Sequence, residues 1–243
     1  MMRKKKFRIL PCGDAAVTVE FGNEISPGVN AQAAAMYRAL LRQGTKGITE
    51  MIPTFRSLTI CYDPCVLSYA LLLKSIKKAA FGLRGSSGAK KRIVKIPVCY
   101  GGEYGVDLEE IAKMKSMTPE AVVSLHASRD YLIYMMGFLP GFAYLGGLDE
   151  RLFCPRLESP RTAIPAGSVG IGGEQTGIYP LASPGGWRLI GMTPVIPYDS
   201  NRKVPFLYQA GDYIRFVPVS KEEYDRIRLL AESDEYVCDV LEE

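Results

Sequence analysis

The sequence lacks most of the groups that mark a metalloenzyme or a nucleotide-binding enzyme. It holds one histidine, one tryptophan and six cysteines in 243 residues, and no two cysteines form a C-x-x-C pair. Structural zinc sites need Cys or His ligands at short spacings, so no metal is expected. A loop of the form G-x-x-x-x-G-K-[ST] is also missing, which excludes a P-loop nucleotide site.

Long apolar runs are missing as well, since none approaches the roughly 18 residues that span a bilayer. The basic start MMRKKKFRIL is followed at once by Pro11, Cys12, Gly13 and Asp14, unlike the apolar core of a signal peptide. We therefore expect a cytoplasmic protein with reduced thiols.

Acidic residues are absent between Pro64 and Gly102, where eight Lys or Arg residues occur. This segment has no interleaved aromatic platform of the kind that binds single-stranded nucleic acid. The net charge of +4 is also too small to indicate a nucleic-acid partner. Neither nucleic acid nor a membrane is expected as a partner.

Glycine and proline are concentrated in residues 137–197, which hold 12 of the 24 glycines and 8 of the 16 prolines. Apolar and aromatic residues are spread through the same stretch, so it can bury a core and is not a disordered linker. Glycine permits positive φ and proline fixes φ near −65°. The stretch therefore predicts short strands joined by tightly specified loops that present a binding surface.

Every cationic side chain in this stretch is an arginine, although the chain has 14 lysines. These four residues are Arg151, Arg156, Arg161 and Arg188. Arginine binds a planar carboxylate or phosphate through two parallel hydrogen bonds, which lysine cannot do. Pairing with a nearby carboxylate remains the alternative for any single one, but at least one is predicted to bind an anion.

Neutral polar groups and one large ring lie near these arginines in the sequence. The segments Gln175-Thr176 and Ser183–Trp187 supply them, and such a set suits a small polar ligand with one carboxylate. His126 is the sole imidazole, so any histidine-based acid–base step must use it. The alternative for His126 is a packed, hydrogen-bonded residue of a helix.

Two segments resemble catalytic motifs but lack their context. Gly170–Gly177 looks like a phosphate-binding glycine loop, yet Ile178-Tyr179-Pro180 follows it instead of a helix. Ser168 lies in a near match to the nucleophile elbow G-x-S-x-G, which requires a following helix and a downstream histidine. Turns between strands are the preferred interpretation of both.

Apolar periodicity and capping residues divide the chain into elements. The first part alternates strands and helices in the order β-α-β-β-α-β, which is the ferredoxin-like arrangement. Its predicted elements are a strand at 17–21, a helix at 27–44, strands at 48–52 and 57–62, a helix from Asp63-Pro64 to Gly82, and a strand at 92–98.

The second half is predicted to be mostly β, a sandwich or barrel with a few peripheral helices. Capping boxes at Asp107–Glu110 and Ser220–Glu223, and an N-cap at Thr118, predict three of these helices. The predicted fold class is α+β, with a small ferredoxin-like domain at residues 1–90 and a cyclophilin-like β-barrel domain at 91–243.

Several specific segments, in order, carry a resemblance to a known family. They are CGDAAVTVEFG (12–22), GFLPGFAYLGGLD (137–149), PRLESPR (155–161), IPAGSVGIGG (164–173), EQTGIYP (174–180) and SPGGWRLIG (183–191). The chain resembles the family of 5-oxoprolinase B subunits (PxpB), also described as the KipI or allophanate hydrolase subunit 1 family. Met192 departs from the family pattern, which has an arginine there.

The resemblance implies the cyclophilin-like barrel and a role beside two partners, a homologous C subunit plus an A subunit. Together they would cleave the lactam of 5-oxo-L-proline to L-glutamate, driven by ATP hydrolysis, and this chain alone would be inactive. Arg156 and Arg161 are then expected to hold the substrate carboxylate or a phosphate. Gln175, Ser183 and Trp187 would shape the pocket. His126 would transfer a proton or orient a group.

Members of this family do different jobs, so two alternatives stay open. One is a KipI-like inhibitor of a sensor histidine kinase, which would dock onto the kinase without needing the arginines. The other is a role in an allophanate hydrolase or urea amidolyase system with a carboxylase partner.

Overall fold

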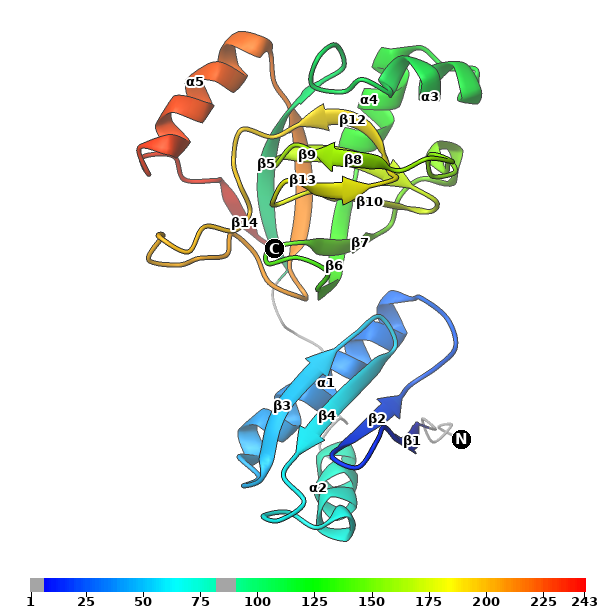
Figure 1. Cartoon of the computed structure of the whole chain (residues 1–243), viewed down its shortest axis with the longest axis vertical. Helices are drawn as coiled ribbons and strands as arrows, with labels where there is room; N and C mark the ends of the chain where they lie inside the picture. Colours follow the sequence, from blue (N-terminus) through cyan, green and yellow to red (C-terminus); the bar gives the residue numbers. More distant parts are fainter. Residues whose placement is uncertain (1–6, 82–90) are drawn as a thin grey trace. The chain divides into compact units, whose positions relative to one another are not determined.

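The computed structural model describes residues 7–81 and 91–243 (Figure 1). The chain divides into two compact units, Met1–Ala89 and Lys90–Glu243. The α+β class and the barrel in the second half are confirmed. Within the described residues, no helix is long and apolar enough to cross a membrane.

The first unit is a four-stranded antiparallel sheet in the order β1-β2-β4-β3, with two helices packed against it. Its elements are β1 (Arg8–Pro11), β2 (Ala16–Glu20), α1 (Pro27–Gln43), β3 (Ile48–Pro53), β4 (Ser57–Tyr62) and α2 (Tyr69–Phe81). Alternate residues of β2 and β4 and one face of each helix form its core.

Capping residues in the sequence correctly predicted the ends of helix α1. The Ser26 hydroxyl caps α1 by accepting a hydrogen bond from the Val29 amide, and Gly44 ends the helix in the left-handed region at φ 56°. The predicted start of α2 was wrong, because the Asp63 carboxylate accepts from the Cys65 amide in a separate turn. The helix begins only at Tyr69, and its predicted stop at Gly82 lies outside the described residues.

The predicted strand at 92–98 exists, but its place in the first sheet was wrong. It forms β5 (Arg92–Tyr100), which pairs with strands of the second unit. The fourth strand of the first sheet is instead β1, which pairs with β2 from the N-terminal side. Periodicity identifies a strand, but it does not identify the strand's partner.

The second unit is built on an eight-stranded sheet in the order β10-β9-β12-β5-β13-β6-β7, with β14 also paired to β5. Strand β10 contacts β7, so the two edges meet and the sheet forms a nearly closed barrel. Its strands are β5, β6 (Asp130–Met136), β7 (Ala143–Gly146), β9 (Ser168–Gly172), β10 (Gln175–Ile178), β12 (Arg188–Met192), β13 (Tyr213–Pro218) and β14 (Val240–Glu242). A separate pair, β8 (Arg161–Ile164) and β11 (Ser183–Gly185), lies outside this sheet.

Three helices cover the barrel. Helices α3 (Leu108–Lys115) and α4 (Pro119–Ala127) lie together beside β12 and β13, and α5 (Lys221–Glu232) packs against β5 (Figure 1). The predicted caps at Thr118 and Ser220 are confirmed, since both hydroxyls accept backbone N–H bonds. Asp107 holds the N-cap position of α3 as predicted, but the predicted capping box was wrong, because its carboxylate makes no capping bond to the helix.

Candidate functional site

The β9–β10 hairpin has two chemically different faces. Side chains alternate along each strand, and residues directly opposite one another share a face. Gly172 lies opposite Gln175, and Gly170 opposite Gly177, on the outer face of the barrel. Trp187 covers this face so closely that a Cβ added to Gly172 would lie 2.2 Å from the indole. A side chain at Gly172 would collide with the indole, so glycine is required there.

Arg156 also lies over that ring. Its guanidinium carbon is 6.0 Å from the ring centroid of Trp187, within cation–π range. The backbone on both sides of Arg156 is held in place, because Arg188 Nε donates to Pro155 O and Leu157 N–H donates to Gly186 O. An exposed arginine is thus presented from a fixed backbone.

Arg161 lies at the start of β8 and reaches the same face. Its Nη2 donates to Asp107 Oδ1 at 2.7 Å, and its Nη1 donates to Trp187 O at 3.4 Å. The pairing of β8 with β11 shifts register between Ser183 and Gly185. This irregularity allows Arg161 and Ile164, three residues apart, to lie on one face.

Tyr179 lies close enough to both arginines to feel their charges. Burial raises the pKa of its hydroxyl, while hydrogen bonding to the Trp187 backbone and the charges of Arg156 and Arg161 oppose that rise. The nearby Ser183 hydroxyl is buried and has no hydrogen-bond partner among the described residues. We call Arg156, Arg161, Tyr179, Ser183 and Trp187 the arginine site.

The other two arginines of the stretch hold the structure together. Arg151 forms two hydrogen bonds to the Asp149 carboxylate, at 2.9 Å each. Arg188 is almost fully buried and pairs with Glu110 at 2.5 Å. Arg151 and Arg188 therefore pair with carboxylates of the protein, which was the alternative to anion binding. Arg161 also pairs with a carboxylate, that of Asp107, through one of its nitrogens.

His126 lies on the opposite side of the hairpin, inside the barrel, and is completely buried. Its Nε2 is 2.8 Å from the Thr176 hydroxyl, which in turn donates to Gly170 O. Thr176 must therefore accept from Nε2–H, so Nδ1 accepts from the Tyr100 hydroxyl at 2.8 Å. Burial lowers the pKa of His126 to about 3, so the ring is neutral at neutral pH.

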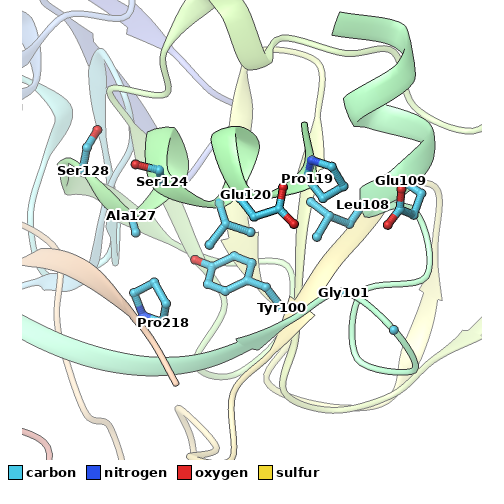
Figure 2. Close-up of a pocket in the computed structure, with 12 residues that line it drawn as sticks. Tyr100, Gly101, Leu108, Glu109, Pro119, Glu120, Ser124, Ala127, Ser128 and Pro218 are labelled. Carbon is cyan, nitrogen blue, oxygen red and sulfur yellow. The ribbon is translucent and has the colours of Figure 1, made fainter. Parts of the chain in front are cut away.

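An open hollow lies next to this histidine, where α3 and α4 meet the end of β5. Figure 2 shows the ring of Tyr100 below α4, with Glu120 on the helix side of the same hollow. Tyr100 thus lines the hollow and is hydrogen-bonded to the buried His126. The structure brings Arg156, Arg161, Ser183 and Trp187 together and leaves Gln175 on their face of the hairpin, but it does not bring His126 to them.

Phosphate binding by the glycine-rich hairpin finds no support in the geometry. Gly170–Gly177 forms β9 and β10 with a short turn between them, and the indole of Trp187 fills the space above its glycines. Strand β10 runs on into β11, so no helix N-terminus follows it in this part of the described chain to receive phosphates. Among residues 7–81 and 91–243, no group of three or more His, Cys, Asp or Glu side chains could hold a metal ion.

Two contributors to the site were missed in the sequence. Asp107 was interpreted as a helix cap, because its spacing to Glu110 fits a capping box. Tyr179 was noted only because its segment follows the glycine-rich loop in place of a helix. A buried carboxylate beside an arginine carries no local sequence signal, so only the fold could bring Asp107 to Arg161.

The fold and the site define an α+β protein whose barrel carries an arginine-lined outer face. The family described as "Carboxyltransferase domain, subdomain C and D" matches residues 7–208, and the chain belongs to this family. The B subunit of 5-oxoprolinase from Bacillus subtilis (strain 168) is 42% identical over 229 residues, covering 90% of this chain and 95% of that protein. The B subunit of 5-oxoprolinase from Haemophilus influenzae is 42% identical over 209 residues, covering 86% of this chain and 96% of that protein.

Longer proteins contain a similar unit. The crystal structure of TTHA0988 superposes with a TM-score of 0.77 at 40% identity, covering 84% of this chain but only 40% of that one. Urea amidolyase from Lachancea kluyveri is 28% identical over 264 residues. The match covers 95% of this chain but only 14% of that protein. Urea amidolyase from Kluyveromyces lactis shares the fold, with a TM-score of 0.79 at 24% identity.

Proposed function

We propose that this chain is the B subunit of a 5-oxoprolinase and acts in the cytoplasm with two partners, a homologous C subunit plus an A subunit. The complex would open the lactam of 5-oxo-L-proline to give L-glutamate at the expense of ATP. The observation that carries the proposal is the arginine site, found on a chain that covers 95% and 96% of two relatives that bear that name.

The substrate fits the chemistry of the site. 5-Oxo-L-proline is a small monocarboxylate with one amide N–H and one amide oxygen. Arg156 and Arg161 would hold the carboxylate, since guanidinium groups suit planar anions. The amide of Gln175 would bind the lactam, and Ser183, whose hydroxyl is buried and unpartnered, would shape the pocket. Trp187 would serve as the platform under Arg156 rather than as a stacking surface for the ligand.

Proton transfer is assigned to the partner proteins. His126 lies on the inner face of the hairpin, behind Thr176, and its low pKa leaves it a poor base. ATP is required at the level of the complex, and the glycine hairpin of this chain does not fit its phosphates. The chain alone is therefore expected to bind the substrate without cleaving it.

Reconstitution tests the proposal. Wild-type chain mixed with the A and C partners should convert 5-oxo-L-proline and ATP to glutamate, and none of the three proteins alone should do so. Arg161→Lys should lower kcat/KM at least tenfold, because lysine cannot reproduce the fork of hydrogen bonds to Asp107, Trp187 O and the ligand. Arg151→Lys is the matched control, since Arg151 pairs with Asp149 outside the arginine site, and it should keep full activity. Equal activity of Arg161→Lys and wild type would count against the assignment.

A urea-related role is the second candidate, favoured by the similarity to urea amidolyase. The lower identity and the small share of that protein covered by this chain place it behind the lactam reaction. Glutamate formation by the reconstituted complex, without activity on urea or allophanate, would separate the two.

A further inference from the structure

Asp107 holds Arg161 and strand β12 at the same time. Its Oδ1 accepts from Arg161 Nη2 at 2.7 Å, and its Oδ2 accepts from the Leu189 amide at 2.6 Å. The residue is 5% exposed, so solvent does little to weaken these bonds. Both oxygens are used, and neither caps the helix that follows.

The backbone that carries Asp107 is itself fixed. Its amide donates to Leu189 O at 2.9 Å, so one residue pair exchanges a backbone bond and a side-chain bond. Two residues earlier, a Cβ added to Gly105 would lie 2.0 Å from Ile190 O. The segment therefore runs directly against β12, and the carboxylate cannot move without moving the strand.

This carboxylate also sets the charge of the arginine site. Arg156 and Arg161 contribute two positive charges and Asp107 contributes one negative charge, which leaves a net charge of one. Arg188 does not add to this sum, because Glu110 pairs with it. A ligand with one negative charge would be neutralised by this arrangement, whereas a dianion would be left with one uncompensated charge.

We infer that Asp107 is a positioning residue that aims the Arg161 guanidinium and matches the site to a monocarboxylate, excluding dianions such as sulfate. The inference rests on the proposed function, since it assumes that the arginine site binds the substrate. It adds a residue and a basis for specificity that the family resemblance does not supply.

The single tryptophan makes the inference directly measurable. Trp187 lies under Arg156, so its fluorescence in the full-length chain reports ligand binding at the site. Titrations with 5-oxo-L-proline and with sulfate would give two affinities for each variant. Asp107→Asn should weaken 5-oxo-L-proline binding about tenfold and should shift the preference toward sulfate by at least tenfold.

Two further variants serve as controls. Glu109→Gln removes an exposed carboxylate two residues away, outside the arginine site, and should leave both affinities unchanged. Asp107→Glu keeps the charge but displaces the carboxylate. It should weaken 5-oxo-L-proline binding while retaining the preference over sulfate, and it serves as the deciding variant if circular dichroism shows that Asp107→Asn is unfolded.

The outcomes separate the inference from the proposed function. If Asp107→Asn weakens both ligands by the same factor, or if Asp107→Glu loses the preference, the charge-matching role is wrong while the site stands. If wild-type fluorescence responds to neither ligand and the reconstituted complex makes no glutamate, the proposed function fails and the inference fails with it.

Discussion

Gly185 and Tyr179 approach each other so closely that no side chain fits between them. A Cβ added to Gly185 would lie 2.5 Å from the Tyr179 hydroxyl and 2.8 Å from Ile164 Cδ1. Gly185 is paired with Arg161 across β8 and β11, so this contact lies inside the arginine site. The glycine thus lets Tyr179 reach the backbone beside Trp187.

Gly185→Ala should therefore disturb both stability and binding. The added methyl must displace Tyr179 or Ile164, and overpacking of this kind costs about 1–3 kcal/mol. Thermal unfolding followed by circular dichroism should show a lower Tm, and the 5-oxo-L-proline titration should show weaker binding.

Gly186→Ala is the matched control for this change. Its added Cβ would meet nothing closer than 3.7 Å, which is ordinary van der Waals contact. Its free energy of unfolding should stay within about 0.5 kcal/mol of wild type. Equal effects of the two substitutions would contradict the packing argument.

The buried histidine predicts a pH dependence of stability. The pKa of His126 falls from 6.5 to about 3 on folding, because burial disfavours the charged ring. The unfolded chain therefore binds a proton below pH 6.5 that the folded chain does not bind. The contribution of neutral His126 to the free energy of unfolding should be fully present above pH 6.5. It should fall by up to about 1.4 kcal/mol per pH unit as the pH is lowered toward 3.

His126→Gln isolates this contribution. Glutamine keeps a polar group between Tyr100 and Thr176 but does not titrate, so urea unfolding between about pH 4.5 and 6.5 should show a flatter slope of stability against pH. This pH range lies above the ordinary pKa of Asp130, so the titration of Asp130 does not contribute to the measured slope. An unchanged slope would mean that the ring is protonated in the folded protein.

Asp130 predicts a pH dependence in a lower range. Hydrogen bonds from Arg215, at 2.6 and 2.9 Å, and from Lys91 at 2.6 Å lower its pKa from 3.8 to about 2. The stabilisation is present above pH 3.8 and is lost as the pH falls toward 2. Asp130→Asn should cost about 1 kcal/mol at about pH 6, after allowance for solvent screening.

The same substitution should cost much less at about pH 2, where about half of wild-type Asp130 is protonated in the folded protein. Chemical unfolding of both proteins at the two pH values would measure the difference. A constant cost across this range would show that packing, rather than charge, decides the effect of Asp130.

Local patterns predicted elements well and their partners poorly. The helix at 27–43 was predictable because Ser26, Pro27 and Gly44 act within a few residues of its ends. The strand at 92–100 was predictable as a strand, but its pairing with β13 joins residues more than a hundred positions apart. Helix α2 was placed too early because Asp63-Pro64 starts a turn as readily as a helix.

The site was partly predictable for the same reason. Arg156, Arg161, Ser183 and Trp187 fall within one short glycine-rich stretch, and the family resemblance predicted them as site residues, but only the fold places them on one face. His126 could not be placed, since its distance from the arginines depends on which face of β10 it meets. His126 is hydrogen-bonded to Thr176, whose side chain points into the barrel, whereas the neighbouring Gln175 lies on the outer face with the arginines.

The two faces of the β9–β10 hairpin have a consequence for engineering. One short ribbon supports the indole on its outside and anchors the imidazole network on its inside. Any attempt to retune ligand choice through this ribbon will also loosen the interior of the barrel. Libraries aimed at new substrates should instead vary the exposed side chains at 158–160, which follow Arg156 on the same loop.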